Sequence, residues 1–241
     1  MLRYPRIIAH RGGSALAPEN TLAGLRLAAR LGCRAVEFDA MLTRDDVPIL
    51  IHDETLARTT DGGGAVAAHS YAQLRAIDAG IRYGNAYRGE SIPTLEQALA
   101  LCAELGLWAN VEIKPSAGRA EETGAVVGRL LARQWRGHGV VSSFSTAALA
   151  AARQTAALPD FALLVDAIPA DWRERLATCG CRALHCRAAD ADPAAIVAVA
   201  AAGVPLACFT VNRRDEAERL FAAGVAAVFT DRPDLWLPDE M

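Results

Sequence analysis

Short apolar runs alternate with longer, alanine-rich amphipathic stretches along most of the 241 residues of the chain. The short runs are typical of buried strands, and the longer stretches have the period of helices. A repeated strand-then-helix order predicts a parallel sheet with helices outside it. So many units in one domain favour a closed (β/α)8 TIM barrel, which usually takes about 250 residues. The expected strands cover 6–10, 35–39, 48–52, 108–114, 139–144, 161–165, 182–186, 205–211 and 226–230.

Nine expected strands are one too many for such a barrel, and the link from Asp39 to His52 explains the extra one. This link is too short for the dozen or so residues of a parallel crossover, so we expect an antiparallel hairpin. A turn centred on Asp45 and Asp46 pairs residues whose numbers add up to 91. That register places His52 opposite Asp39.

Acidic residues interrupt two of the apolar runs. Glu37 and Asp39 are two positions apart in "AVEFD", and Glu112 and Lys114 repeat the pattern in "NVEIK". Residues two apart share one face of a strand, so both pairs point into the barrel. Buried carboxylates without a counter-charge are costly, and three of them need a cation. Carboxylates without cysteine suit a hard ion, so Mg²⁺ or Ca²⁺ is expected at Glu37, Asp39 and Glu112.

The stretch "AHRGGSALAPENT" supplies groups that suit phosphate. His10 and Arg11 end the first expected strand, glycines follow, and Asn20 is expected to cap the next helix. His10 and His52 could divide general acid and general base work in the cleavage of a phosphodiester. Arg11 and Lys114 would hold the non-bridging oxygens.

Each of these residues also has a purely structural interpretation. The acids could pair with a nearby cation, and His52 could be a hydrogen-bonded core histidine. Arg11 could pair with Glu19, and Lys114 could neutralise Glu112. The acids, histidines and basic side chains taken together favour a reactive site.

Composition narrows the partners and the compartment. The net charge of −3 gives no basic field for nucleic acid or an anionic membrane, so small-molecule partners are expected. No apolar run approaches the roughly 18 residues of a membrane span, and the N-terminus has no signal-like apolar segment. We therefore expect a cytoplasmic protein. The six cysteines lie scattered in apolar segments, which predicts reduced, buried thiols.

At this point the sequence resembles the glycerophosphodiester phosphodiesterases, within the broader phospholipase-C-like phosphodiesterases. The resemblance implies a divalent metal at Glu37, Asp39 and Glu112, catalytic roles for His10 and His52, and phosphate contacts from Arg11 and Lys114. It also implies hydrolysis of glycerophosphodiesters, such as glycerophosphocholine or glycerophosphoethanolamine, to glycerol 3-phosphate and an alcohol. The matching pieces are "AHRGGSALAPENT", "VEFDAMLTRDDVPILIHDETLARTT", "IPTLEQAL", "VEIK", "FTVN" and "TDRPD".

The chain departs from the family pattern at two positions. Phe209 stands where the family usually has Trp, in the wall expected against the glycerol or alcohol group, and Asp46 stands where Gly is common. Residues 53–93 correspond to a small segment that the family inserts over the barrel mouth, within a single domain spanning 1–241. Their length is typical of a lid or binding loop, so leaving-group selectivity is expected there.

Several functional alternatives remain open from the sequence. Lysophospholipids are an alternative substrate, as in a lysophospholipase D-type reaction or another phosphodiester cleavage on the same barrel. A non-catalytic barrel that binds a phosphorylated ligand, and a barrel glycosidase with paired carboxylates, are less favoured. Mn²⁺ is a further candidate ion, and neither the oligomeric state nor the order of the two histidines is assigned.

Overall fold

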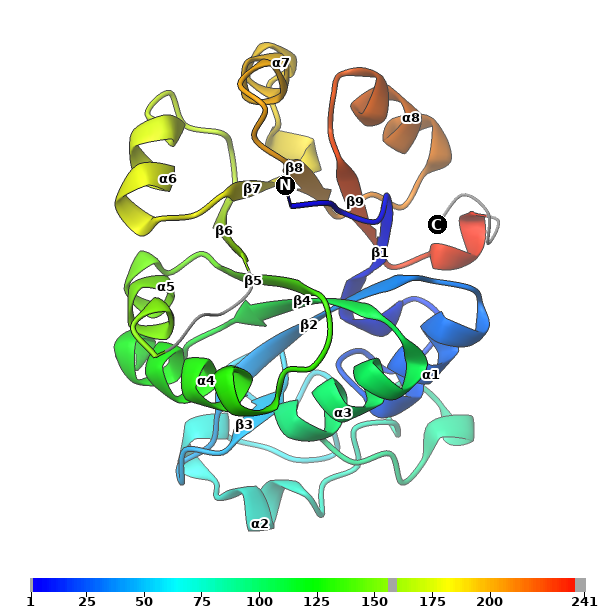
Figure 1. The fold of residues 1–241 in the computed structure, drawn as a ribbon. Coiled ribbons are helices and arrows are strands. Elements are labelled where there is room, and N and C mark those ends of the chain that lie inside the picture. The colour runs from blue at the N-terminus through cyan, green and yellow to red at the C-terminus, as the bar shows by residue number, and fades with distance from the viewer. Residues whose placement is uncertain (1, 156–159, 237–241) are drawn as a thin grey trace.

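Eight parallel strands form a closed ring in the computed structural model, which describes residues 2–155 and 160–236. The first strand pairs with both the second and the last, so the sheet closes on itself (Figure 1). The (β/α)8 barrel expected from the sequence is confirmed. Its strands are β1 (Ile7–Ala9), β2 (Ala35–Leu42), β4 (Trp108–Ile113), β5 (Gly139–Ser143), β6 (Asp160–Val165), β7 (Ala183–Arg187), β8 (Leu206–Phe209) and β9 (Ala227–Thr230).

Helices surround this ring and bury their apolar faces against its outer side (Figure 1). Thr94 and Gln97 form a capping box at one helix start, and Gly106 ends that helix at a positive φ of 66°. The helices are α1 (Leu22–Arg30), α3 (Leu95–Leu105), α4 (Ala120–Gln134), α5 (Thr146–Arg153), α6 (Trp172–Cys179), α7 (Pro193–Ala201) and α8 (Arg214–Ala222).

The ninth strand, β3 (Pro48–Leu50), forms the expected antiparallel hairpin with β2, but the expected register is wrong by one residue. Ala40 pairs with Leu50, so the numbers of facing residues add up to 90 rather than 91. The turn has three residues, 44–46, because Asp46 adopts a left-handed φ of 60° where the sequence argument assumed a two-residue turn. His52 therefore lies beyond the paired strand, and its position depends on the bend that follows.

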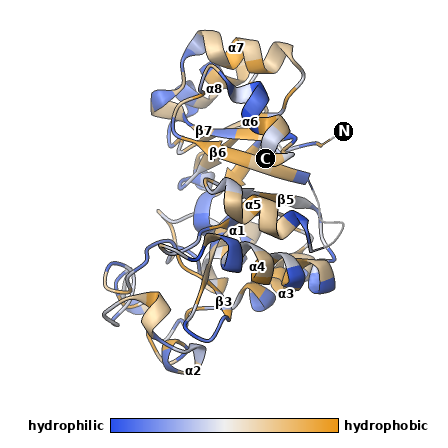
Figure 2. Ribbon diagram, turned by 90° about the vertical axis from the view of Figure 1, so that its left-hand side faces the viewer, coloured by the Kyte–Doolittle hydropathy of each residue, from blue (hydrophilic) through white to orange (hydrophobic). Residues whose placement is uncertain are grey.

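Residues 53–93 project from one side of the barrel around the short helix α2 (Tyr71–Leu74) (Figure 2). They also contain the 3-10 turns η2 (Val66–Ala68) and η3 (Asn85–Tyr87). A separate apolar cluster, which includes Met41, Leu56 and Ile92, joins this segment to β2 and β3. That it is a family insertion within a single domain stays a prediction.

Side chains alternate between the two faces of the barrel wall. Ile7 and Val36 belong to the apolar cluster beneath the helices, whereas Ile8 and Ala35 belong to a smaller cluster inside the ring. All six cysteines are buried and free, as expected. Within the described ranges, no helix has the length and apolar character needed to cross a membrane.

Candidate active site

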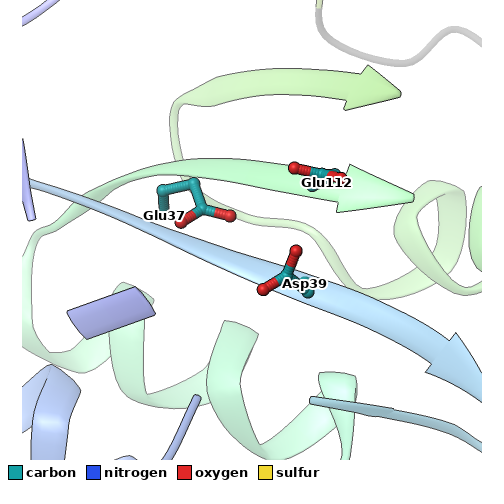
Figure 3. Close-up of side chains that lie close together, drawn as sticks. All are labelled: Glu37, Asp39 and Glu112. Atoms are coloured by element: carbon teal, nitrogen blue, oxygen red, sulfur yellow. The ribbon is translucent and has the colours of Figure 1, made fainter. Parts of the chain in front are cut away.

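Three carboxylates meet on two neighbouring strands of the barrel. Glu37 and Asp39 lie on β2, Glu112 lies on β4, and the three side chains point toward one another (Figure 3). The register pairs Asp39 directly with Glu112. One oxygen from each carboxylate can be chosen so that all three lie within 4.8 Å of one another. All three residues are buried, so the group predicted from the two-residue spacing does assemble.

The charges in this group are incompletely balanced. Burial, together with Asp39 and Glu112, raises the pKa of Glu37 well above its usual value. Burial and Asp39 raise the pKa of Glu112 to about 7. Oε1 of Glu37 is buried without a hydrogen-bond partner. An unpartnered carboxylate oxygen among three buried acids fits a divalent cation, which would supply the missing charge.

Two basic side chains border the carboxylates. Nε of Arg11 lies 3.4 Å from Oδ2 of Asp39, and Nζ of Lys114 lies 3.3 Å from Glu112 and 3.6 Å from Asp39. Burial alone would raise the pKa of Asp39, but Arg11 and Lys114 lower it below its ordinary value. Arg11 also pairs with Glu19 at 3.0 Å. The structural pairings considered for both cations are thus present, and both cations still face the site.

The glycine-containing turn after β1 brings Arg11 into place. This turn, η1 (His10–Gly12), lets the backbone N–H of Arg11 donate to Oε2 of Glu37 at 2.9 Å. A Cβ atom at Gly12 would lie 2.9 Å from the backbone carbon of Gly24 in α1, so only glycine fits there. The turn therefore packs closely on α1 while it presents a backbone donor to the site.

Asn20 has a different role from the expected one. Thr21 caps α1, because its side chain accepts from the N–H of Gly24. Asn20 has a φ of 57°; its Nδ2 donates to Oδ2 of Asp39 at 2.8 Å, and its Oδ1 accepts from the N–H of Asp39 at 3.0 Å. The helix start is thus shifted by one residue, and Asn20 orients a candidate metal ligand.

His10 is held by an aspartate from the other end of the chain. Its Nδ1 donates to Oδ1 of Asp231, just after β9, at 2.7 Å. Ser14 and Asn212 donate to the same carboxylate at 2.6 and 2.8 Å. Although burial opposes ionisation, these hydrogen bonds lower the pKa of Asp231. His10 consequently presents Nε2 to the site, 3.8 Å from Oε2 of Glu37.

His52 is held by its own neighbour in the chain. Nδ1 of His52 donates to Oδ1 of Asp53 at 2.7 Å, which fixes the imidazole although the residue lies outside the β2–β3 ladder. Burial lowers the pKa of His52, an effect that Asp39 and Asp53 only partly offset. The imidazole therefore favours the neutral form more than an exposed histidine does.

These groups surround one pocket of about 420 Å³, within the range of small-molecule sites. Seven of the eight predicted site residues line it: His10, Arg11, Glu37, His52, Glu112, Lys114 and Phe209. The eighth, Asp39, joins them through the carboxylate group. Phe144, at the end of β5, packs edge-on against Phe209 with ring centroids 5.9 Å apart. Arg187 and Thr210 complete this part of the wall.

That residues 53–93 control leaving-group selectivity stays a prediction. None of the residues described in that segment lines the pocket, and the wall around Phe144 and Phe209 comes from the ends of β5, β7 and β8. The segment reaches the site indirectly, through Asp53 and Arg58.

Sequence reasoning missed four residues that hold the site groups. Asn20, Asp53, Arg58 and Asp231 each hydrogen-bond a carboxylate or a histidine of the site, or a carboxylate that does so. Asp231 follows an expected strand, and Asp53 follows His52 directly, so both carried a positional signal. No signal in the sequence linked Arg58 to Glu19.

Comparison with known proteins agrees with this geometry. A model of the Glycerophosphoryl diester phosphodiesterase family matches residues 10–235. A glycerophosphodiester phosphodiesterase from Caldanaerobacter subterraneus is 32% identical over 233 residues, which is 95% of this chain and 94% of that protein. One from Bacillus subtilis is 30% identical over 253 residues, 95% of this chain and 84% of that protein.

A solved structure is also similar throughout. It is a phosphodiesterase from Oleispira antarctica in complex with the product sn-glycerol-3-phosphate. It is 39% identical, with a TM-score of 0.93, and the match covers 96% of this chain and 94% of that one. The chain therefore belongs to the glycerophosphoryl diester phosphodiesterase family and is an enzyme of that family.

Proposed function

We propose that the protein catalyses the metal-dependent hydrolysis of glycerophosphodiesters, such as glycerophosphocholine or glycerophosphoethanolamine, to glycerol 3-phosphate and an alcohol. One observation carries the proposal: three buried carboxylates, two anchored histidines and two basic side chains surround a single pocket. The small-molecule product bound to the Oleispira relative supports this class of substrate.

Glu37, Asp39 and Glu112 are the residues that would hold the metal. Their oxygen-only donor set suits a hard cation, so we propose Mg²⁺ or Ca²⁺, with Mn²⁺ as a further candidate. When bound, such an ion polarises a phosphoryl oxygen and offsets the negative charge of the phosphate. Asn20 holds Asp39 by two hydrogen bonds, which limits the rotation of this ligand.

The remaining residues position the phosphate and move protons. Arg11 and Lys114 border the carboxylates and would bind the non-bridging oxygens of the diester. In both histidines Nδ1 is engaged by an aspartate, so Nε2 is the atom that exchanges a proton with the substrate. One histidine would take the proton of the nucleophile, and the other would protonate the leaving oxygen.

The test is release of glycerol 3-phosphate from glycerophosphocholine by metal-stripped protein, before and after Mg²⁺, Ca²⁺ or Mn²⁺ is restored. We expect release only with metal, and loss of release in Glu112→Gln under every condition. Glu104→Gln, on an exposed part of α3, is the matched control and should behave as the wild type. Turnover that persists in excess chelator would contradict the metal-dependent mechanism.

A second candidate substrate rests on the apolar rim of the pocket. Phe144 is 43% exposed and pairs with Phe209, so the leaving side of the pocket offers an aromatic surface to a bulky apolar group. A lysophospholipid would place its acyl chain near such a surface. Parallel assays on glycerophosphocholine and lysophosphatidylcholine, with wild type and Phe144→Ala, separate the two. Loss confined to the lysophospholipid would support the second candidate.

A further inference from the structure

Arg58 connects two carboxylates that belong to different parts of the fold. Its guanidinium donates to Glu19, in the turn before α1, at 2.7 and 2.8 Å. The same group donates to Asp53, beyond β3, at 2.6 and 3.0 Å. Each contact is a two-point contact, so the guanidinium orients both carboxylates at once.

Each of these carboxylates in turn holds a group of the site. Glu19 accepts from Arg11 at 3.0 Å, and Asp53 accepts from His52 at 2.7 Å. Arg58 itself does not line the pocket among the residues described. It therefore forms the centre of a chain of charges that runs from Arg11 through Glu19, Arg58 and Asp53 to His52.

We infer that Arg58 is a positioning residue. It aligns the imidazole of His52 with the guanidinium of Arg11, so that the histidine exchanges a proton with the same phosphodiester group that the arginine binds. The inference rests on the proposed function of His52 and Arg11. Only a planar guanidinium can offer paired donors to two carboxylates at once, whereas a lysine ammonium contacts them as a point charge. The segment 53–93 thus acts on the reaction through alignment rather than through contact with substrate.

The physical basis is geometric. Without Arg58, Glu19 would be held by Arg11 alone and Asp53 by His52 alone, so both site groups would gain freedom of rotation. A misplacement of about 1 Å at a reacting group can lower the rate by as much as about 100-fold. Arg58 is half exposed, and exposed ion pairs stabilise a fold only weakly, so the loss should appear in kinetics rather than in folding.

The test is a pair of double-mutant cycles on the metal-loaded, full-length protein. We expect Arg58→Ala to lower kcat about tenfold and to raise KM about threefold, since each half of the chain of charges loses alignment. In an Asp53→Asn background, Arg58→Ala should lower kcat no further; in a Glu19→Gln background, it should raise KM no further. Arg58→Lys should recover only part of the loss.

Arg82→Ala is the matched control. Arg82 lies in the same segment and donates to the backbone oxygen of Thr60 at 2.9 Å. Among the described residues, it pairs with no carboxylate of the site. The control should keep wild-type kinetics and melt at the same temperature as Arg58→Ala. Fully additive effects in both cycles, or an equal kinetic loss in Arg82→Ala, would overturn the inference.

A binding measurement separates this inference from the proposed function. Calorimetric titration of inorganic phosphate into the metal-loaded protein needs no turnover. Arg58→Ala should weaken phosphate binding about threefold in the wild-type background and leave it unchanged in Glu19→Gln. A wild type that releases no glycerol 3-phosphate but shows this pattern would contradict the proposed function alone. A wild type that turns over without this pattern would contradict the positioning role.

Discussion

Each of the two histidines is hydrogen-bonded to an aspartate, but the two aspartates are held by different groups. In both, Nδ1 donates to an aspartate at 2.7 Å. On the His10 side, the carboxylate of Asp231 receives its other hydrogen bonds from the neutral groups of Ser14 and Asn212. On the His52 side, the carboxylate of Asp53 also accepts hydrogen bonds from the Arg58 cation, which lowers the pKa of Asp53 below its usual range.

The two histidines also differ in how far along the chain their aspartates lie. The His10 side lies where β1 and β9 pair and the barrel closes, so its aspartate comes from a residue 221 positions away. The His52 side uses an adjacent residue and a nearby arginine, so it is local in sequence. Both carboxylates are ionised, but the positive charge of Arg58 offsets part of the field of Asp53 at its imidazole. We therefore expect Asp231, which has no such cation beside it among the described residues, to matter more.

The largest expected effect comes from removing the imidazole of either histidine. His10→Ala and His52→Ala should each lower kcat by about 100- to 10,000-fold, the usual contribution of a general acid or base. The double variant should lose little beyond the worse single one, because the two act in one reaction. Steady-state assays on glycerophosphocholine check this, with half-buried His69→Ala, outside the pocket, as control. Near-normal turnover in either single variant would remove that side from the mechanism.

The buried carboxylates of the site predict that the free energy of unfolding depends on pH. In metal-free protein the pKa of Glu112 is about 7, above its unfolded value of 4.5, so the folded state holds its proton more tightly. The contribution of Glu112 to stability is then greatest below about pH 4.5 and is lost as the pH rises to 7, by up to about 3 kcal/mol. Urea unfolding in chelator between pH 4.5 and 8 measures the slope. Glu112→Gln, or restored metal, should flatten it; an unchanged slope in both would contradict the assignment.

Replacing each of the two aspartates by asparagine compares the His10 side and the His52 side directly. We expect Asp231→Asn to lower kcat about 100-fold and Asp53→Asn about tenfold, because only Asp53 shares its charge with an arginine. The asparagine is nearly isosteric, so the fold should be retained. Paired measurements of kcat and KM on both variants test the ranking. Equal losses would show that the shared cation does not weaken the support of His52.

The smallest effect is expected at the rim, away from both histidines. Phe209→Trp restores the residue usual in the family, and Phe209 packs edge-on against Phe144 rather than on either imidazole. Two aromatic rings of similar character should give a KM change of no more than about threefold, with kcat unchanged. Phe144→Tyr is the matched variant for the partner ring. A tenfold or larger change in kcat would place Phe209 nearer the reacting atoms than the structure does.

Much of the site could be predicted because the strand period is simple. The two-residue spacings and the expected barrel together group Glu37, Asp39 and Glu112, and the parallel register brings them together. The prediction that Asn20 caps a helix is wrong, because this residue has a left-handed φ of 57° and its side chain hydrogen-bonds to Asp39. The hairpin register was wrong because one left-handed residue, Asp46, lengthens the turn. Both errors arise from single backbone angles, on which the letters of the sequence give little information.

The sequence by itself determined the barrel, the polar faces of β2 and β4, and the residue types at the site, because alternation and strand-helix order act over short distances. The tertiary structure alone decided which residues support them. Asp231 reaches His10 only because the ring closes between β1 and β9, and Glu19 meets Arg58 only because residues 53–93 fold back toward the turn before α1. Such contacts depend on the closure of the whole chain, and no local pattern specifies them.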